Sequence, residues 1–151
     1  MNEEEKRHQQ RMQKKKALID AKVAKATEER GVLIVLSGPG KGKSSSGFGT
    51  VIRCIGHGYK AAVVQFIKGT WDCGERNFLQ QRCPEVPFIV MGSGFTWETQ
   101  SRERDREAAQ QAWQQTKTLL NDASLHLVLL DELTYILKYG YIDAEEVYEA
   151  L

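Results

Sequence analysis

The sequence predicts an α/β domain in which helices flank a parallel sheet. Apolar runs alternate with segments of helical pattern, a glycine-rich loop follows the first run, and two acidic residues end the last one. With 151 residues, 41% of them hydrophobic and 27% charged, the chain has the size and composition of one globular domain with a buried core.

Residues 1–30 are predicted to form a helical arm that precedes the α/β domain at residues 31–151. The segment is charged, rich in Gln and Ala, and free of Gly and Pro, which favours helix. Its apolar stripe is narrow and includes Leu18, Ile19 and Val23, so an isolated arm would fray. Two interpretations stay open: a solvated leader, or an arm that becomes ordered over a ligand or a second subunit.

Four apolar runs are predicted to be buried parallel strands. The first, "GVLIVLSG" at 31–38, is continuous and ends in glycine, which is typical of a central strand buried on both faces. The others are "AAVVQFI" at 61–67, the short "PFIVMG" at 87–92 and "LHLVLLDE" at 125–132. Such strands, separated by helices, belong to a parallel sheet.

Helices are predicted between these strands. One runs from about 43 to 55, directly after the glycine-rich loop. Ser101 can cap a longer helix at 102–120, whose apolar side includes Trp113, which we expect in the core. Near the end of the chain, Asp143 and Glu146 form a D-x-x-E capping pair that opens a last helix.

Charge, hydropathy and cysteine content exclude several classes of function. The net charge of +1 offers no general attraction to polyanions, so we expect no nucleic-acid partner. No apolar run approaches the roughly 20 residues of a membrane span, so we expect no membrane partner either. The spacings of the three cysteines match no metal motif, and without a signal peptide they are typical of reduced thiols in the cytoplasm.

The loop after the first strand nearly matches a phosphate-binding loop, G-x-x-x-x-G-K-[ST]. Residues 42–44 supply Gly-Lys-Ser, but Ser37 stands where the first glycine belongs, and Gly38 comes one residue late. The glycines still allow backbone N–H groups to converge on an anion. The candidate nucleotide-binding residues of the loop are Gly38, Pro39, Gly40, Lys41, Gly42, Lys43, Ser44 and Ser45.

Charge in and around this loop favours a triphosphate. The following helix adds about half a positive charge at its N-terminus. Lys43 supplies a full charge and Lys41 can add a second, whereas Pro39 has no N–H to donate. The Ser44 hydroxyl can ligate Mg²⁺. By itself, the pattern also fits a simple glycine turn between a strand and a helix.

The strand that ends in "LVLLDE" supplies the other half of a nucleoside-triphosphate site. Asp131 or Glu132 can hold Mg²⁺ directly or through water, so the predicted metal ligands are Ser44, Asp131 and Glu132. An ATPase or a kinase acting on another substrate would need a group that positions water or a hydroxyl, and Glu132 is the one candidate for that role.

Two aromatic, glycine-containing loops follow the second and third predicted strands. Loops at the carboxyl ends of parallel strands line the binding crevice, so both lie on the side of Lys43. They carry Trp71, Phe95 and Trp97, and we expect Trp97 to face a ligand. Arg76 also lies near the site by its position after the second strand, as do Gln65, Lys68 and Asn77.

Five segments together resemble one family, the phosphate-loop type of bacterial ATP:cob(I)alamin (corrinoid) adenosyltransferase. They are "GPGKGKSS", "GHGYKAAVVQFIKGTW", "GERN", "GFTWETQ" and "VLLDELTY", in the family's order, within a resemblance that runs from about residue 7 to 151. The resemblance implies transfer of the 5′-deoxyadenosyl group of ATP to the cobalt of a reduced corrinoid, cob(I)alamin, with release of triphosphate. That reaction serves adenosylcobalamin synthesis and salvage.

The resemblance also implies a structure and partners. It implies a Rossmann-like sheet of the P-loop NTPase type, a homodimer, a reduced flavodoxin-type electron donor, and an arm that folds over the corrinoid. Family members usually continue further, so C-terminal strands are expected to be missing here. The alternatives are a P-loop ATPase or kinase and a catalytically impaired nucleotide-binding fragment.

The chemistry implied needs few reactive side chains. Cobalt(I) is itself a strong nucleophile, so no Ser, Cys or His nucleophile is required, and the protein must stabilise charge on the triphosphate and align the substrates. The predicted catalytic residues are Lys43, Phe95 and Trp97. Lys43 would stabilise the charge on the triphosphate. The resemblance implies that Phe95 and Trp97 exclude the axial ligand of Co(II). Arg76 is predicted to be a further nucleotide-binding residue. Pro39 stands where the family commonly has Asn, and Ser44–Ser45 where it has two threonines.

Overall fold

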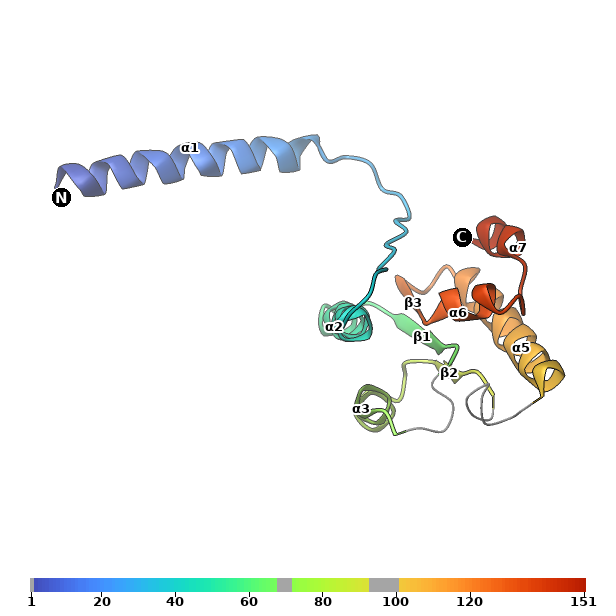
Figure 1. Cartoon of the computed structure of the whole chain (residues 1–151). Coiled ribbons are helices and arrows are strands. Elements are labelled where there is room, and N and C mark those ends of the chain that lie inside the picture. Colours follow the sequence, from blue (N-terminus) through green and yellow to red (C-terminus); the bar gives the residue numbers. More distant parts are fainter. Residues whose placement is uncertain (1, 68–71, 93–100) are drawn as a thin grey trace. The chain divides into compact units, whose positions relative to one another are not determined.

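The computed structural model describes residues 2–67, 72–92 and 101–151 (Figure 1). The chain forms two compact units, Met1–Ile34 and Val35–Leu151, and each is described by itself.

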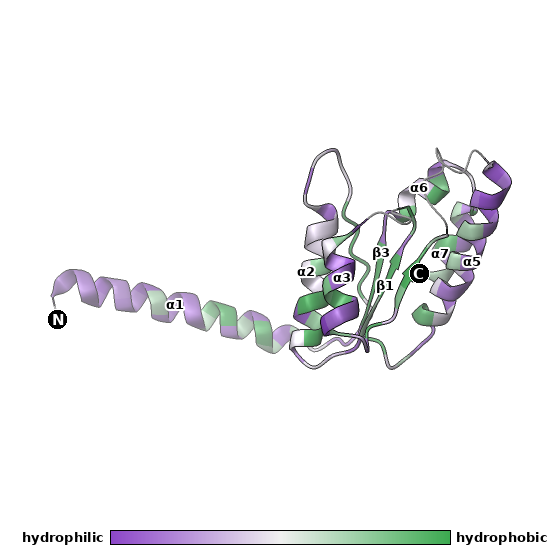
Figure 2. Cartoon of the chain, turned by 90° about the horizontal axis from the view of Figure 1, so that it is seen from below, coloured by the Kyte–Doolittle hydropathy of each residue, from purple (hydrophilic) through white to green (hydrophobic). Residues whose placement is uncertain are grey.

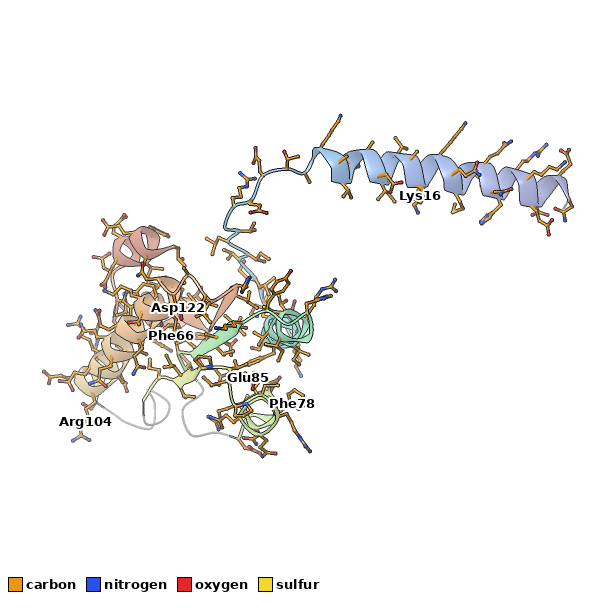
Figure 3. All side chains as sticks on the ribbon, turned by 180° about the vertical axis from the view of Figure 1, so that it is seen from behind. Lys16, Phe66, Phe78, Glu85, Arg104 and Asp122 are labelled. Carbon is orange, nitrogen blue, oxygen red and sulfur yellow. The ribbon has the colours of Figure 1, made fainter. Side chains whose placement is uncertain are left out.

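The first unit consists mainly of the helix α1, Glu3–Lys25, as predicted. Its N-terminus is closed by a capping box, in which Glu5 N donates to Asn2 Oδ1 and Asn2 N donates to Glu5 Oε2, both at 2.8 Å. Lys16, labelled in Figure 3, donates to Asp20 one turn along at 2.6 Å. No residue of α1 is buried, so within this unit only local interactions support the helix.

The prediction of a first strand at 31–38 is wrong. The segment forms no strand, and its apolar side chains are exposed, from 47% for Leu36 to 75% for Val32. A continuous apolar run predicts burial, but a strand exists only where a neighbouring strand supplies hydrogen-bond partners. Residues 31–36 have no such partner in the part of the chain that the structure describes.

The second unit is built on a parallel sheet with the strand order β2-β1-β3. The strands are β1 (Ala61–Gln65), β2 (Phe88–Val90) and β3 (Leu127–Asp131). The central strand β1 is buried along its whole length. Gln65 is in register with Val90 of β2 and with Asp131 of β3, so the three strands end together. These three strands confirm three of the four predicted ones.

Helices cover both faces of this sheet (Figures 1 and 2). On one face lie α2 (Lys43–Gly56) and α3 (Gly74–Arg82). On the other lie α5 (Arg102–Leu120), α6 (Leu133–Lys138) and α7 (Ala144–Ala150). The α/β prediction is therefore confirmed, with α2 and α5 close to their predicted bounds; α3 and α6 were not predicted. None of the described helices combines the length and apolar character needed to cross a bilayer.

Alternate residues of β1, together with Phe66 just after it, supply two hydrophobic clusters, one on each face. Ala61 and Val63 pack with Phe48 and Val51 of α2. Val64 and Phe66 belong to the opposite cluster, in which α5, α6 and α7 take part; Phe66 is labelled in Figure 3. This alternation follows from the two-residue period of a strand.

The predicted helix caps at Ser101 and Asp143 and the predicted burial of Trp113 are confirmed, but the predicted capping role of Glu146 is not. Ser101 Oγ accepts from Arg104 N, and Asp143 Oδ1 accepts from Glu145 N. Trp113 is fully buried, as expected. Glu146, however, accepts from Trp113 Nε1 at 3.0 Å and from Lys117 Nζ at 2.8 Å, so it ties α7 to α5 and does not complete the cap.

Candidate functional site

The loop that precedes α2 has the backbone conformation that only glycine adopts readily. Gly38, Gly40 and Gly42 have φ values of 117°, 110° and 109°. A Cβ atom added at any of them would meet nothing within 4 Å, so backbone conformation, not crowding, requires glycine there.

Lys43 organises this loop. Its Nζ donates to Gly38 O at 2.8 Å and to Gly40 O at 3.0 Å, so the loop is wrapped around the ammonium group. An ammonium has three protons, and these two bonds leave one for a ligand. Gly42 caps α2 with its backbone alone, as Ser46 N donates to Gly42 O at 2.8 Å. Gly42 provides no side-chain cap, and a helix N-terminus of this kind can bind an anion.

A hydrogen-bonded chain joins this loop to the sheet. Ser44 Oγ donates to Asp131 Oδ1 at 2.9 Å, and Gln65 Nε2 donates to Asp131 Oδ2 at 3.0 Å. Asp131 is 6% exposed and Gln65 is fully buried. The register that pairs Gln65 with Asp131 brings both to the carboxyl edge of the sheet, where α2 begins. The structure thus brings together two of the three predicted metal ligands, Ser44 and Asp131.

Glu132, the third predicted ligand, follows Asp131 in a strained conformation. Its φ of 63° is the one positive value outside glycine among the described residues. Left-handed backbone costs roughly 1–2 kcal/mol for an ordinary L-residue, and such strain gathers at functional positions. Glu132 is the N-cap residue of α6, is half-buried, and makes no side-chain hydrogen bond to another described residue.

The segment "GERN" was expected to belong to the loop after the second predicted strand, but it forms the first turn of α3. Arg76 and Asn77 lie in the first turn of this helix, and Asn77 Nδ2 donates to Asp72. The Cys73 thiol donates to Glu75 Oε2 at 3.3 Å and lies 4.0 Å from Gln65 Nε2. The start of α3 therefore adjoins the buried end of β1, beside Asp131.

Phe95 and Trp97 lie outside the described residues, as do Lys68 and Trp71, so their predicted roles stay predictions. Among the other candidate residues of the loop, Lys41 and Ser45 are exposed, whereas Lys43 and Ser44 are half-buried. Pro39 is also exposed.

Sequence reasoning placed Gln65 near the site by its strand position, but gave its side chain no part in the chemistry. One signal was available: it is the single polar residue in the apolar run "AAVVQFI". A buried polar side chain inside a strand needs a partner, which points toward a site.

The oxygen-rich group around Ser44 has the donor types that Mg²⁺ prefers. A hydroxyl, one carboxylate beside it and a second carboxylate at the next residue are all hard oxygen ligands. The described residues contain no cluster of three or more His, Cys, Asp or Glu side chains arranged to enclose a metal. Phosphate oxygens and water would therefore complete the coordination shell, as is usual for Mg²⁺ with nucleotides.

Comparisons with known proteins agree along nearly the whole chain. A family model described as "ATP:corrinoid adenosyltransferase BtuR/CobO/CobP" matches residues 29–151, and one described as "Cob(I)alamin adenosyltransferase N terminal" matches residues 1–23. The corrinoid adenosyltransferase of Escherichia coli K12 is 54% identical over 96% of this chain and 73% of its own length. Corrinoid adenosyltransferase CobA of Salmonella typhimurium is 54% identical, and the Pseudomonas aeruginosa enzyme 53%, the latter over 96% of this chain and 71% of its own.

Proposed function

The chain belongs to the ATP:corrinoid adenosyltransferase family, and from this premise we propose how its residues carry out the reaction. The protein is a transferase of adenosylcobalamin synthesis, with ATP and a corrinoid as substrates. An electron pair of cobalt(I) forms the bond to C5′ of ATP, the bond from C5′ to oxygen breaks, and its electrons leave with the triphosphate. The protein has no proton to remove from the attacking atom.

We propose that the triphosphate binds in the loop around Lys43. The observation that carries this proposal is the arrangement of Lys43 Nζ, with two protons held by Gly38 O and Gly40 O and a third available to a phosphate oxygen. The N-terminus of α2, which has no side-chain cap, adds backbone donors and a partial positive charge at the same place. Lys41 adds a second, exposed cation. These positively charged groups and backbone donors are already in position, so they stabilise the negative charge that develops on the departing triphosphate.

Mg²⁺ is proposed to bind with the triphosphate at Ser44. The Ser44 hydroxyl is a hard oxygen ligand of the kind that Mg²⁺ prefers, and its proton is donated to Asp131. Asp131 orients the Ser44 hydroxyl, so we propose a supporting role for it. We assign direct ligation to Glu132, whose side chain makes no hydrogen bond to another described residue. When bound, Mg²⁺ neutralises triphosphate charge and makes it a better leaving group.

Phe95 and Trp97 are proposed to act on the corrinoid. Aromatic side chains beside the cobalt would exclude its axial ligand, which makes Co(II) easier to reduce. Position after β2 supports this role, since loops at the carboxyl ends of parallel strands line the ligand crevice. Arg76, in the first turn of α3, is proposed as a further contact to the nucleotide.

We also propose the domain boundary and the partners. The chain is divided into an arm, 1–30, and a nucleotide-binding domain, 31–151. Two family models support this division, because one ends at residue 23 and the other begins at residue 29. The apolar side chains of Met12, Ile19 and Val23, all at least 45% exposed, give α1 a surface with which to cover the corrinoid. A homodimer, a reduced flavodoxin-type donor and a cytoplasmic location are proposed from the family resemblance.

Product analysis tests this function. The protein is incubated without oxygen with MgATP and chemically reduced cobalamin, and the products are followed by absorbance and by anion chromatography. We expect the light-sensitive spectrum of adenosylcobalamin and an equal amount of inorganic triphosphate. ADP with phosphate would indicate an ATPase or kinase, and bound ATP without turnover would indicate an impaired fragment; either result would contradict the proposal.

A further inference from the structure

Gln65 is a buried amide with one unsatisfied atom. The side chain is fully buried at the end of β1, and its Nε2 donates to Asp131 Oδ2 at 3.0 Å. Within the part of the chain that the structure describes, its Oε1 has no hydrogen-bond partner. Leaving a buried acceptor unsatisfied costs roughly 1–3 kcal/mol, so a fold that retains one has a use for it.

The orientation of this amide follows from its neighbour. Asp131 also accepts from Ser44, and an ionised carboxylate accepts hydrogen bonds without donating any. The nitrogen of Gln65 must therefore face Asp131, and the oxygen must face elsewhere. The thiol of Cys73 does not satisfy that oxygen, since it donates to Glu75. Oε1 is thus held as an acceptor beside the Ser44–Asp131 pair.

From this geometry we infer that Gln65 is a positioning residue for the cation that accompanies the triphosphate. Its nitrogen holds Asp131 in the orientation that receives the Ser44 proton. Its oxygen accepts a hydrogen bond from a water of the hydrated Mg²⁺. The inference rests on the Mg²⁺ site proposed above and adds Gln65, which would contact the ligands of the metal and not the metal itself.

A metal-bound water can donate a hydrogen bond to Gln65 Oε1, whereas the phosphate groups of the ligand cannot. Oε1 needs a donor, and the oxygens of a triphosphate only accept, so they cannot satisfy it. Mg²⁺ keeps several of its waters when it binds with phosphates, and each of those waters is a polarised donor. A nucleoside hydroxyl or amine is the other source of a donor, and inorganic triphosphate lacks both. Residues in this supporting position typically contribute 10- to 100-fold to metal affinity.

The test measures binding of Mn²⁺, in place of Mg²⁺, with inorganic triphosphate. Free Mn²⁺ is followed by electron paramagnetic resonance, and binding of triphosphate alone, with chelator present, by calorimetry. In Gln65→Met, a variant of similar shape with no polar group, we expect about tenfold weaker binding of Mn²⁺ with triphosphate and unchanged binding of triphosphate alone. Should this variant fail to fold, Gln65→Asn, whose amide is one methylene too short to reach, carries the same expectation.

A matched control is Thr116→Val. Thr116 is equally buried, its hydroxyl donates to Ala112 O, and it lies on α5 away from the loop, so the variant should bind Mn²⁺ with triphosphate as the wild type does. Equal losses with and without metal would show that Gln65 is merely structural, and a loss seen with ATP but not with triphosphate would assign its oxygen to the nucleoside; each overturns the inference. A wild-type protein that transfers adenosyl groups yet binds no Mn²⁺ would instead contradict the proposed metal site.

Discussion

Replacing Lys43 by alanine tests the proposed triphosphate loop most sharply. A unit charge about 4 Å from a developing phosphate charge is worth roughly 4 kcal/mol at an effective dielectric constant of about 20. Lys43 is half-buried, so solvent screens part of this interaction, and we expect about 2–3 kcal/mol to be lost from the transition state. That corresponds to a fall of about 100-fold in kcat/KM.

The assay is the initial rate of adenosylcobalamin formation from MgATP and chemically prepared cob(I)alamin, with the melting temperature measured in parallel. Gly38 O and Gly40 O lie in an exposed loop, so water replaces the lost ammonium and stability should fall by less than about 1 kcal/mol. Lys60→Ala, an exposed lysine at the opposite end of β1, should leave the rate unchanged. A loss below about tenfold in Lys43→Ala, or a comparable loss in Lys60→Ala, would refute the assignment.

Three further predictions concern the loop, the corrinoid and the core. Gly40→Ala places an L-residue where φ is 110°, a value that it avoids, so the exposed loop should relax to another conformation. ATP affinity, measured by calorimetry, should then fall about tenfold while the melting temperature stays within about 2 °C; unchanged affinity would contradict this. Trp97→Ala should slow turnover strongly when Co(II) and a biological reductant are supplied, and little when Co(I) is supplied; equal losses would remove the proposed role. Glu146→Ala, which breaks the bonds to Trp113 and Lys117, should lower the melting temperature by about 2–4 °C in calorimetry without changing turnover; an unchanged melting temperature would show that the link contributes nothing.

Much of the fold follows from local pattern. The helical period of 102–120 predicted α5 and the burial of Trp113, and the apolar runs around residues 63 and 129 predicted two strands. These elements depend on side-chain periodicity, which is visible in sequence. The run 31–38 has the same apolar character but pairs with no strand among the described residues, and pairing is a property of the fold as a whole.

The site was only partly visible in the sequence. The glycine spacing identified the loop, and the paired acids at 131–132 identified the opposite strand. Two features depend on tertiary structure and were missed: the role of Gln65, which the strand register places beside Asp131, and α3, whose polar first turn looks like a loop. The strain at Glu132 is a backbone property that no sequence pattern signals.

A crystal structure with Mg²⁺, ATP and cob(II)alamin bound would test the central claim most directly. The account predicts a phosphate oxygen within hydrogen-bonding distance of Lys43 Nζ, Mg²⁺ on the Ser44 hydroxyl, and C5′ of ATP facing the cobalt. A triphosphate bound away from Lys43 and Ser44, with C5′ turned from the corrinoid, would contradict it.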